Sequence, residues 1–462
     1  MRRATEIAES VRSGAVTALE VTEAALATIA ARDTAHNCFT TVTFDRARRE
    51  AESVDAARRA GKPLGPLAGV PYAVKNLFDV AGLPTVAGTR TRSLLPPARD
   101  DAELVKRLTQ AGAILVGTLN MDAYAYGFTT ENTAYGVTHN PHDRKRIAGG
   151  SSGGSAAALA AGMVPLSLGS DTNGSIRVPA SLCGVFGLKP TFGRLPRTGS
   201  YPFVANLDHL GPFATSTADL AISYDAMQGL DPADPACAQR PVEPATPSLS
   251  RGTGELRVAR LTGYFDDWAS DTARAAAQRA ADSLGAVAEV ELPEVARARA
   301  AAFIITATEG GTLRLPELRT RYADMEPHSR DRLVAGALTP GAWYVHAQKL
   351  RAWYLAKVRE LFSRFDVLIA PSTPVPATEI GQDWLQLNGQ RIPLRPNLGL
   401  FTQPISCIGL PVAAVPIEGV SPLPIGVQII AAPWREDLCL RAAAHLERLG
   451  IAKARIVPDT AS

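Results

Sequence analysis

The sequence lacks the features that mark disulfide-rich, membrane-spanning and nucleic-acid-binding proteins. Its cysteines are few and odd in number, without a CxxC pair, so neither a disulfide scaffold nor a zinc module is expected and a reducing cytoplasm fits them best. No apolar run reaches the ~18 residues that a transmembrane helix requires. A formal net charge of +3 over 462 residues gives no reason to expect nucleic-acid binding. The five cysteines stand far apart, at Cys38, Cys183, Cys237, Cys407 and Cys439.

Two further absences concern the start of the chain and metal chemistry. The segment from Met1 to Glu6 carries charge but no apolar stretch follows it, which indicates an amphipathic helix and not a signal peptide. The chain has no HExxH motif and no clustered Cys/His set, so we expect no metal and no cofactor. No apolar hairpin suited to membrane binding stands near the N-terminus.

What the sequence does contain is a large apolar fraction, arranged in helices and strands that alternate. Hydrophobic residues make up 46% and charged residues 20%, as in a globular enzyme. Thr17 and Glu20 form a capping box that predicts the start of a helix with Leu26 and Ile29 on its apolar face. Further helices are predicted over residues 45–59, 101–111, 341–362 and 436–449, and strands over 70–74, 114–116, 256–261, 288–292, 366–369 and 426–430. This alternation favours a sheet covered by helices, and residues 231–255 are expected to form a surface excursion or linker.

A serine- and glycine-rich segment, Gly149–Ser155, precedes a run of Ala and Leu that should be helical. Glycines let the backbone approach a ligand closely, and the N–H groups at the helix start would face this loop. A phosphate-binding loop is one interpretation, but the Walker pattern needs Lys followed by Ser or Thr where Ser155 and Ala156 stand. A tight helix-packing turn is the other, although two adjacent serines among four glycines disfavour it.

A second segment, Gly169–Arg177, places Ser175 after a turn and before a helix expected over residues 176–183. Consecutive backbone N–H groups at such a turn can stabilise an oxyanion, which suits a nucleophile. It is not a G-x-S-x-G elbow, and a serine nucleophile needs a base. None of the seven histidines stands in an evident triad context. Lys75, at the end of a short apolar strand, is the remaining candidate, since burial would lower its pKa, and the alternative is a solvated lysine.

Five segments together resemble the motifs of the amidase signature family. In order along the chain, they are Val70–Asn76, Gly149–Ser155, Gly169–Arg177, Gly184–Pro190 and Pro424–Gln428. The resemblance covers nearly the whole chain and is weakest over residues 231–255. It implies an α/β amidase signature fold, with a large mixed central β-sheet covered by helices on both faces. It further implies a single domain over residues 1–462, with a signature core at about 65–215.

The resemblance also implies a Ser-cisSer-Lys triad. Ser175 matches the nucleophile, Ser151 the bridging cis-serine and Lys75 the terminal base. Neutral Lys75 would take a proton from Ser151, which takes one from Ser175 as it attacks an amide carbonyl. The relay would then return a proton to the leaving amine. The expected activity is therefore amide hydrolysis through an acyl-enzyme.

By the same resemblance, the turn before Ser175 forms the oxyanion hole, braced by Ser170 and Asp171. The expected donors are four consecutive backbone N–H groups, those of Thr172, Asn173, Gly174 and Ser175. The family usually has Gly where Asn173 stands. Asn tolerates left-handed φ better than most residues, so the turn can form, and the Asn173 side chain could face the substrate.

Substrate preference depends on shorter matches. Glu131–Gly136 is similar to the glutaminase subunits of tRNA-dependent amidotransferases, and Thr172–Val178 is closer to a subgroup that hydrolyses 1-carboxybiuret in cyanuric acid degradation. A glutaminase of this family holds the α-carboxylate of glutamine with an arginine, which falls on Arg332, and its α-ammonium with an aspartate, whose position here is Gly399. We therefore expect a small carboxylated urea or biuret as the substrate, and glutamine to be a poor one.

Several alternatives stay open. The protein could be a glutaminase subunit, a general aliphatic or aryl amidase, or an inactive structural subunit, which the presence of all three triad residues disfavours. Arg332 could be a solvated charge on a helix surface. The resemblance also implies association with a small helical accessory subunit, within a homodimer or heterotetramer, whereas no nucleic-acid or membrane partner is expected.

Overall fold

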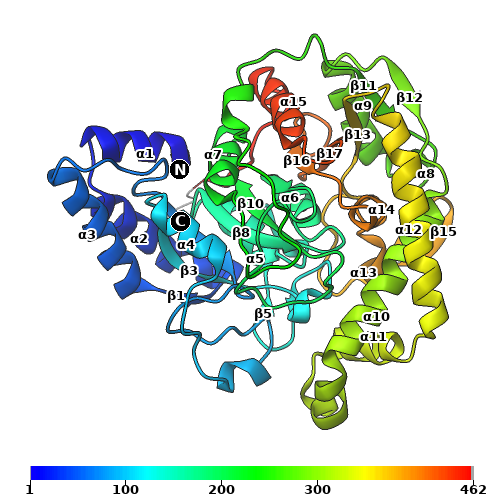
Figure 1. Ribbon diagram of the computed structural model, residues 1–462, viewed down its shortest axis with the longest axis horizontal. Coiled ribbons are helices and arrows are strands. Elements are labelled where there is room, and N and C mark those ends of the chain that lie inside the picture. Colours follow the sequence, from blue (N-terminus) through cyan, green and yellow to red (C-terminus); the bar gives the residue numbers. More distant parts are fainter. Residues whose placement is uncertain (1, 459–462) are drawn as a thin grey trace.

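The computed structural model describes residues 2–458, and strands from the whole of this range form one 11-stranded mixed sheet (Figure 1). Its strands, in spatial order, are β1 (Phe39–Val42), β3 (Ile114–Leu119), β2 (Pro71–Lys75), β8 (Leu166–Asp171), β10 (His209–Ala214), β9 (Phe186–Lys189), β16 (Val412–Pro416), β17 (Gly426–Ala431), β13 (Val367–Pro371), β11 (Val258–Leu261) and β12 (Ala288–Val290). Strand β2 pairs in parallel with β3 and β8, and β11 with β12 and β13, whereas the other neighbours are antiparallel. Three two-stranded ribbons lie outside it: β4 (Glu131–Asn132) with β5 (Gly136–Val137), β6 (His139–Asn140) with β7 (Asp143–Ile147), and β14 (Trp384–Leu387) with β15 (Gln390–Pro393).

Helices cover this sheet on both faces. The helices of the described range are α1 (Ala4–Ser13), α2 (Ala18–His36), α3 (Phe44–Arg59), α4 (Glu103–Gln110), α5 (Gly153–Ala160), α6 (Arg177–Cys183), α7 (Thr217–Met227), α8 (Tyr264–Asp267), α9 (Asp271–Ser283), α10 (Val295–Arg321), α11 (Pro327–Ala337), α12 (Gly341–Leu361), α13 (Leu394–Asn397), α14 (Gln403–Cys407) and α15 (Glu436–Arg448). Helices α5 and α6 pack together on β8, β9 and β16, and α7 and α15 pack together on β9, β10, β16 and β17. Every residue of β8, β9, β10, β16 and β17 is buried, so the expected fold class is confirmed.

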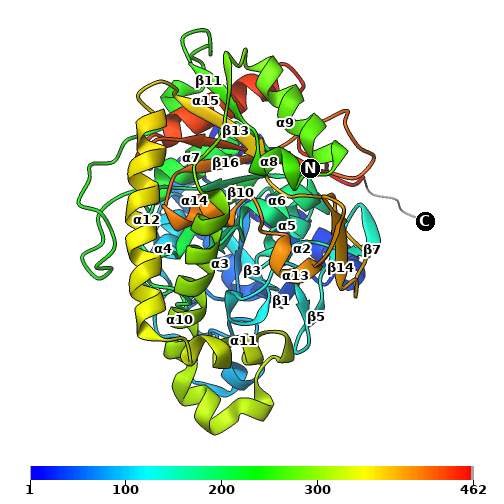
Figure 2. The same cartoon turned by 90° about the vertical axis from the view of Figure 1, so that its right-hand side faces the viewer.

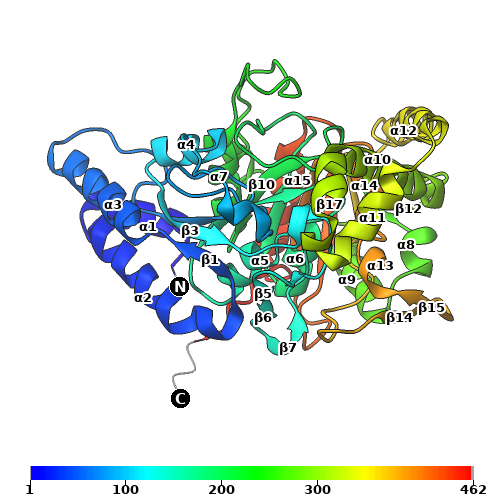
Figure 3. The same ribbon diagram turned by 90° about the horizontal axis from the view of Figure 1, so that it is seen from below.

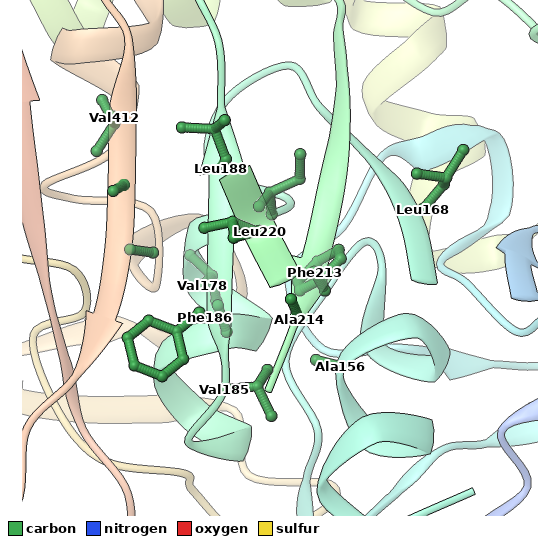
Figure 4. Packing of buried hydrophobic residues seen from close by; sticks show 14 of the residues in the cluster. Ala156, Leu168, Val178, Val185, Phe186, Leu188, Phe213, Ala214, Leu220 and Val412 are labelled. Carbon is green, nitrogen blue, oxygen red and sulfur yellow. The ribbon is translucent and has the colours of Figure 1, made fainter. Parts of the chain in front are cut away.

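The centre of the sheet lies in one continuous hydrophobic core. Figure 4 shows side chains of β9, β10, α6 and α7 gathered there, among them Phe186, Phe213, Val178 and Leu220, which are all fully buried. Burial of this kind is the main favourable contribution to folding. The core thus holds the middle strands and α6 as a rigid base for the loops at their ends.

Most of the predicted elements are confirmed, with ends that differ by a few residues. Helix α2 begins where the capping box predicts: the Thr17 side chain accepts from the Glu20 N–H, and the Thr17 N–H donates to the Glu20 carboxylate at 2.7 Å. The amphipathic helix expected at the chain start is α1, which begins at Ala4, whereas Met1 lies outside the described residues. Residues 231–255 contain only the short 3₁₀ turn Thr246–Ser248.

Two helices that the sequence analysis does not predict, α10 and α11, form a hairpin beside α12 (Figure 2). Gly310, Gly311 and Pro316 lie inside α10 and resemble helix breakers in the sequence. The structure explains the glycines, because a Cβ at Gly311 would overlap the backbone of α11 and a Cβ at Gly336 would overlap the carbonyl oxygen of Ala307. The two helices therefore cross at glycines that let their backbones touch.

The hairpin stands at the opposite end of the molecule from α1, α2 and α3 (Figures 1 and 3). Strand β2 carries Lys75 and strand β8 carries Ser170, and the two strands are neighbours in the sheet. Within residues 2–458, no helix is long and apolar enough to cross a membrane.

Candidate active site

Lys75 is the last residue of β2 and is completely buried. Its Nζ donates to Ser151 Oγ at 2.7 Å and to Ser170 Oγ at 2.9 Å. Burial lowers the pKa of Lys75 to about 7, although the carboxylates of Asp122 and Asp171 oppose that effect. The alternative of a solvated lysine is wrong, and the amine can be neutral near pH 7.

Ser151 lies in the loop between β7 and α5, and the peptide bond that joins it to Gly150 is cis. The loop is packed tightly, since a Cβ at Gly150 would overlap the Asp122 carboxylate. The first N–H groups of α5 have protein acceptors: Gly153 donates to Thr130 Oγ1 and Gly154 to the carbonyl of Asn120, each at 3.1 Å. The phosphate-binding interpretation of this loop is therefore wrong.

The turn that carries Ser175 is braced by a buried ion pair between Asp171 and Arg177, at 2.9 Å. The Asp171 carboxylate also accepts from the N–H groups of Gly174 at 2.7 Å and Ile176 at 3.2 Å. Burial alone would raise the pKa of Asp171, but the Arg177 guanidinium outweighs it and holds that pKa well below its usual range. Asp171 thus fixes both ends of the turn around Ser175.

This bracing changes the expected oxyanion hole at one position. The Gly174 N–H points to Asp171 and is not free, which leaves the N–H groups of Thr172, Asn173 and Ser175 as candidates. Gly174 has φ +137°, and a Cβ there would overlap the hydroxyl of Thr402. The left-handed backbone in this turn is therefore at Gly174 and not, as the departure from the family pattern suggested, at Asn173.

Ser175 lies between β8 and α6 and lines a small pocket. Within residues 2–458 its Oγ makes no hydrogen bond, and no histidine or acidic side chain lines the pocket. Its lining residues are Ala125, Tyr126, Gly127, Phe128, Thr172, Asn173, Ser175, Phe203, Phe303, Thr306, Arg332, Pro396 and Gln403. The pocket therefore joins the predicted nucleophile to Arg332, the one charged residue in its wall.

Arg332 lies on α11, and its guanidinium stacks on Tyr126, 3.9 Å from the ring centroid. It also donates to the carbonyl oxygens of Tyr126 and His328. Burial lowers the pKa of Arg332, and no acidic side chain of the described range forms an ion pair with it. The alternative of a solvated surface arginine is wrong: Arg332 is partly buried and lines the pocket as a cation without an ion-pair partner in the described range.

The structure also shows site residues that the sequence analysis does not identify. Thr306, on α10, accepts a hydrogen bond from Asn173 Nδ2 at 2.8 Å, and Phe128 and Phe203 supply aromatic walls. No local sequence pattern marks these residues, because they meet Ser175 only through the tertiary fold. No group of three or more His, Cys, Asp or Glu in residues 2–458 could hold a metal ion.

Comparison with known proteins identifies the family. The Amidase family model matches residues 20–440. AtzE of Pseudomonas sp. (strain ADP), which belongs to a 1-carboxybiuret hydrolase, is 57% identical, over 97% of this chain and 99% of that protein. A glutamyl-tRNA(Gln) amidotransferase subunit of Chloroflexus aurantiacus is 38% identical, over 95% of this chain and 94% of that one.

A solved structure supports the same assignment at the level of the fold. It comes from a vestigial protein complex that reveals the evolutionary origins of an s-triazine catabolic enzyme, and it superposes with a TM-score of 0.97 at 57% identity, over 98% of this chain and 100% of that one. Family match, relatives and fold agree along almost the entire sequence. The chain belongs to the amidase signature family and is an amide-cleaving hydrolase.

Proposed function

We propose that this enzyme hydrolyses the terminal amide of 1-carboxybiuret, giving urea-1,3-dicarboxylate and ammonia. The proposal depends mainly on the composition of the pocket wall. Ser175 and Arg332 line the same pocket, and no acidic side chain lines it with them. The relative with 57% identity is part of a 1-carboxybiuret hydrolase, which supports the same substrate.

In the proposed mechanism, the neutral amine of Lys75 accepts the Ser151 proton while Ser151 accepts that of Ser175. The Lys75–Ser151 distance of 2.7 Å and the pKa of about 7 for Lys75 suit the first transfer. Ser175 Oγ attacks the terminal carbonyl carbon, the C–N bond to the amino group breaks, and the relay returns a proton so that ammonia leaves. Water then cleaves the acyl-enzyme by the same relay.

The N–H groups of Thr172, Asn173 and Ser175 are the proposed oxyanion donors, without Gly174. A turn held by the Asp171–Arg177 pair keeps these donors in place before the substrate arrives. Such preorganised donors commonly provide the largest electrostatic contribution to acyl transfer.

The proposed substrate follows from which charges the pocket can neutralise. Arg332 suits a carboxylate, whereas an α-ammonium would find no anion in the wall. Gly399 has no room for the missing aspartate, because a Cβ there would lie 2.5 Å from Phe128 Cζ. A carboxylated biuret therefore fits the pocket better than glutamine does.

Association with a small helical accessory chain, within a homodimer or heterotetramer, is also proposed. It is supported by the similarity to a structure described as a protein complex and to amidotransferase subunits. Co-expression with a small neighbouring reading frame should improve the yield of folded enzyme, and a stable, fully active lone chain would remove this part of the proposal.

The deciding experiment measures ammonia release from 1-carboxybiuret and from glutamine by the same preparation. We expect kcat/KM for 1-carboxybiuret to exceed that for glutamine by more than about 100-fold, because the α-ammonium of glutamine would be buried without a partner. A preference for glutamine would identify the runner-up function, a glutaminase subunit of a tRNA-dependent amidotransferase. Simple aliphatic and aryl amides serve as the comparison for a general amidase.

A further inference from the structure

The side-chain amide of Asn173 has one hydrogen-bonded end and one free end. Its Nδ2 donates to Thr306 Oγ1 at 2.8 Å, and only 8% of Asn173 and 2% of Thr306 are exposed. Its Oδ1 is buried, and no group in residues 2–458 donates to it. A buried carbonyl oxygen without a donor is unfavourable, so a ligand that supplies an N–H at this point gains affinity.

Asn173 is one of the residues that line the pocket together with Ser175 and Arg332. Asn173 stands two residues before the nucleophile in a tight turn, whereas Arg332 comes from α11. In the proposed binding mode, the atom next to the reacting carbonyl lies beside Asn173 and the carboxylate lies at Arg332.

We propose that Asn173 Oδ1 accepts a hydrogen bond from an N–H bonded directly to the carbonyl under attack. The site thereby selects ureido acids, in which nitrogen stands at that position, over carboxamides that have a methylene there. The inference rests on the proposed function and deepens it, since 1-carboxybiuret has this N–H and glutamine has CH₂. A methylene would leave Oδ1 unpaired, and buried polar groups reject analogues that lack their partner.

Thr306 acts in this scheme as a positioning residue. Because its hydroxyl accepts from Nδ2, the donor end of the amide is held on α10 and the acceptor end is left for the ligand. Losing that hydroxyl frees the amide to rotate, and either end can then face the substrate. The preference for ligands with an N–H next to the carbonyl should therefore depend on Thr306 as well as on Asn173.

The test uses 3-ureidopropionate and glutaramate as ligands. The two acids have equal chain lengths, a terminal amide and a carboxylate, and they differ only in NH against CH₂ beside the amide carbonyl. Titration calorimetry on the Ser175→Ala protein measures binding without turnover. We expect 3-ureidopropionate to bind about ten-fold more tightly than glutaramate.

Three further substitutions in that background locate the effect. Asn173→Gly keeps the backbone N–H and removes the acceptor, so the ratio of the two affinities should fall to about one. Thr306→Val should lower it similarly, and Thr306→Ser, which keeps the hydroxyl, should restore it. A merely structural role for Thr306 would weaken both ligands equally and leave the ratio unchanged.

Three results would overturn the inference. The Ser175→Ala protein could bind the two acids equally, or it could bind neither measurably. The preference for 3-ureidopropionate could also persist after Asn173→Gly. Ammonia release from 1-carboxybiuret by the unsubstituted enzyme is measured separately. If that reaction is absent while the ureido preference is present, the proposed function fails and the role of Asn173 stands. If the reaction is present without the preference, only the role of Asn173 fails.

Discussion

Ser170 Oγ lies 2.9 Å from Lys75 Nζ, and the two side chains come from neighbouring parallel strands. Lys75 ends β2, and Ser170 is the penultimate residue of β8. The carboxyl ends of parallel strands meet at the same edge of a sheet, where ligands of α/β proteins commonly bind. This pairing brings the lysine to the turn that begins at Asp171 and carries Ser175.

The first prediction concerns pH. Because the mechanism needs neutral Lys75 and burial lowers its pKa to about 7, kcat/KM should rise with pH and level off above about 8. Lys75→Ala should remove nearly all activity, while His139→Ala and His142→Ala should retain it. A profile that falls between pH 6 and 8 would exclude a neutral lysine as the base.

Ser170→Ala should move that profile. Ser170 accepts from Lys75 and so favours the charged ammonium, which means that its loss lowers the pKa of Lys75 and shifts the rising limb to lower pH. We also expect kcat to fall by about ten-fold, because one of two hydrogen bonds that orient Nζ is lost. Ser167→Ala is the matched control on β8, since Ser167 donates to the Ser155 carbonyl at 2.9 Å. Identical profiles for the two variants would contradict the assignment.

Ser175→Ala should lower kcat by at least about 10³-fold with an unchanged circular dichroism spectrum and melting temperature, because covalent catalysis is lost. The acyl-enzyme can be trapped by rapid acid quenching of the unsubstituted enzyme and located by mass spectrometry. A label on a peptide without Ser175 would assign the nucleophile elsewhere.

Arg332→Ala should raise KM for 1-carboxybiuret far more than it lowers kcat, because the carboxylate contact is made in both the ground and transition states. Arg330→Ala is the control on the same helix: Arg330 stacks on Tyr322 and does not line the pocket. Steady-state ammonia release gives both constants. An equal effect of the two substitutions would show that Arg332 does not bind the substrate.

Asp171→Asn should destabilise the fold as well as the turn. The pair with Arg177 is fully buried, and removing one partner leaves a buried guanidinium uncompensated, at about 3–5 kcal/mol in the free energy of unfolding. Urea denaturation at pH 7 measures this loss. Glu23→Gln, which removes an exposed partner of Arg48, should change the denaturation midpoint far less.

Much of the fold could be predicted from the sequence because its signals are local. The capping box at Thr17, the short apolar strands and the order of the motifs all depend on neighbouring residues. Helix α10 could not, since Gly311 and Pro316 resemble breakers unless the facing helix is known. Its glycines are explained by close contact with α11, which is a tertiary effect.

The candidate site divides in the same way. Lys75, Ser151 and Ser175 stand in contiguous motifs, so their residue types and order identify them. Thr306 and Phe128 belong to segments far from these motifs and enter the pocket only through packing. The engagement of the Gly174 N–H by Asp171 also needs coordinates, because a run of backbone donors in a sequence does not show which of them are already occupied.

The glycine crossing of α10 and α11 separates what this protein must keep from what it can vary. Lys75 and Ser170 lie on β2 and β8, whereas Thr306 and Arg332 reach the pocket from a helical hairpin whose backbones cross at Gly311 and Gly336. Substitutions within residues 295–337, whether they arise in evolution or by design, can therefore change the pocket wall. Such substitutions leave Lys75, Ser151 and Ser175 in place. Enzymes that evolve from such a scaffold would differ in their substrates before they differ in the reaction that they catalyse.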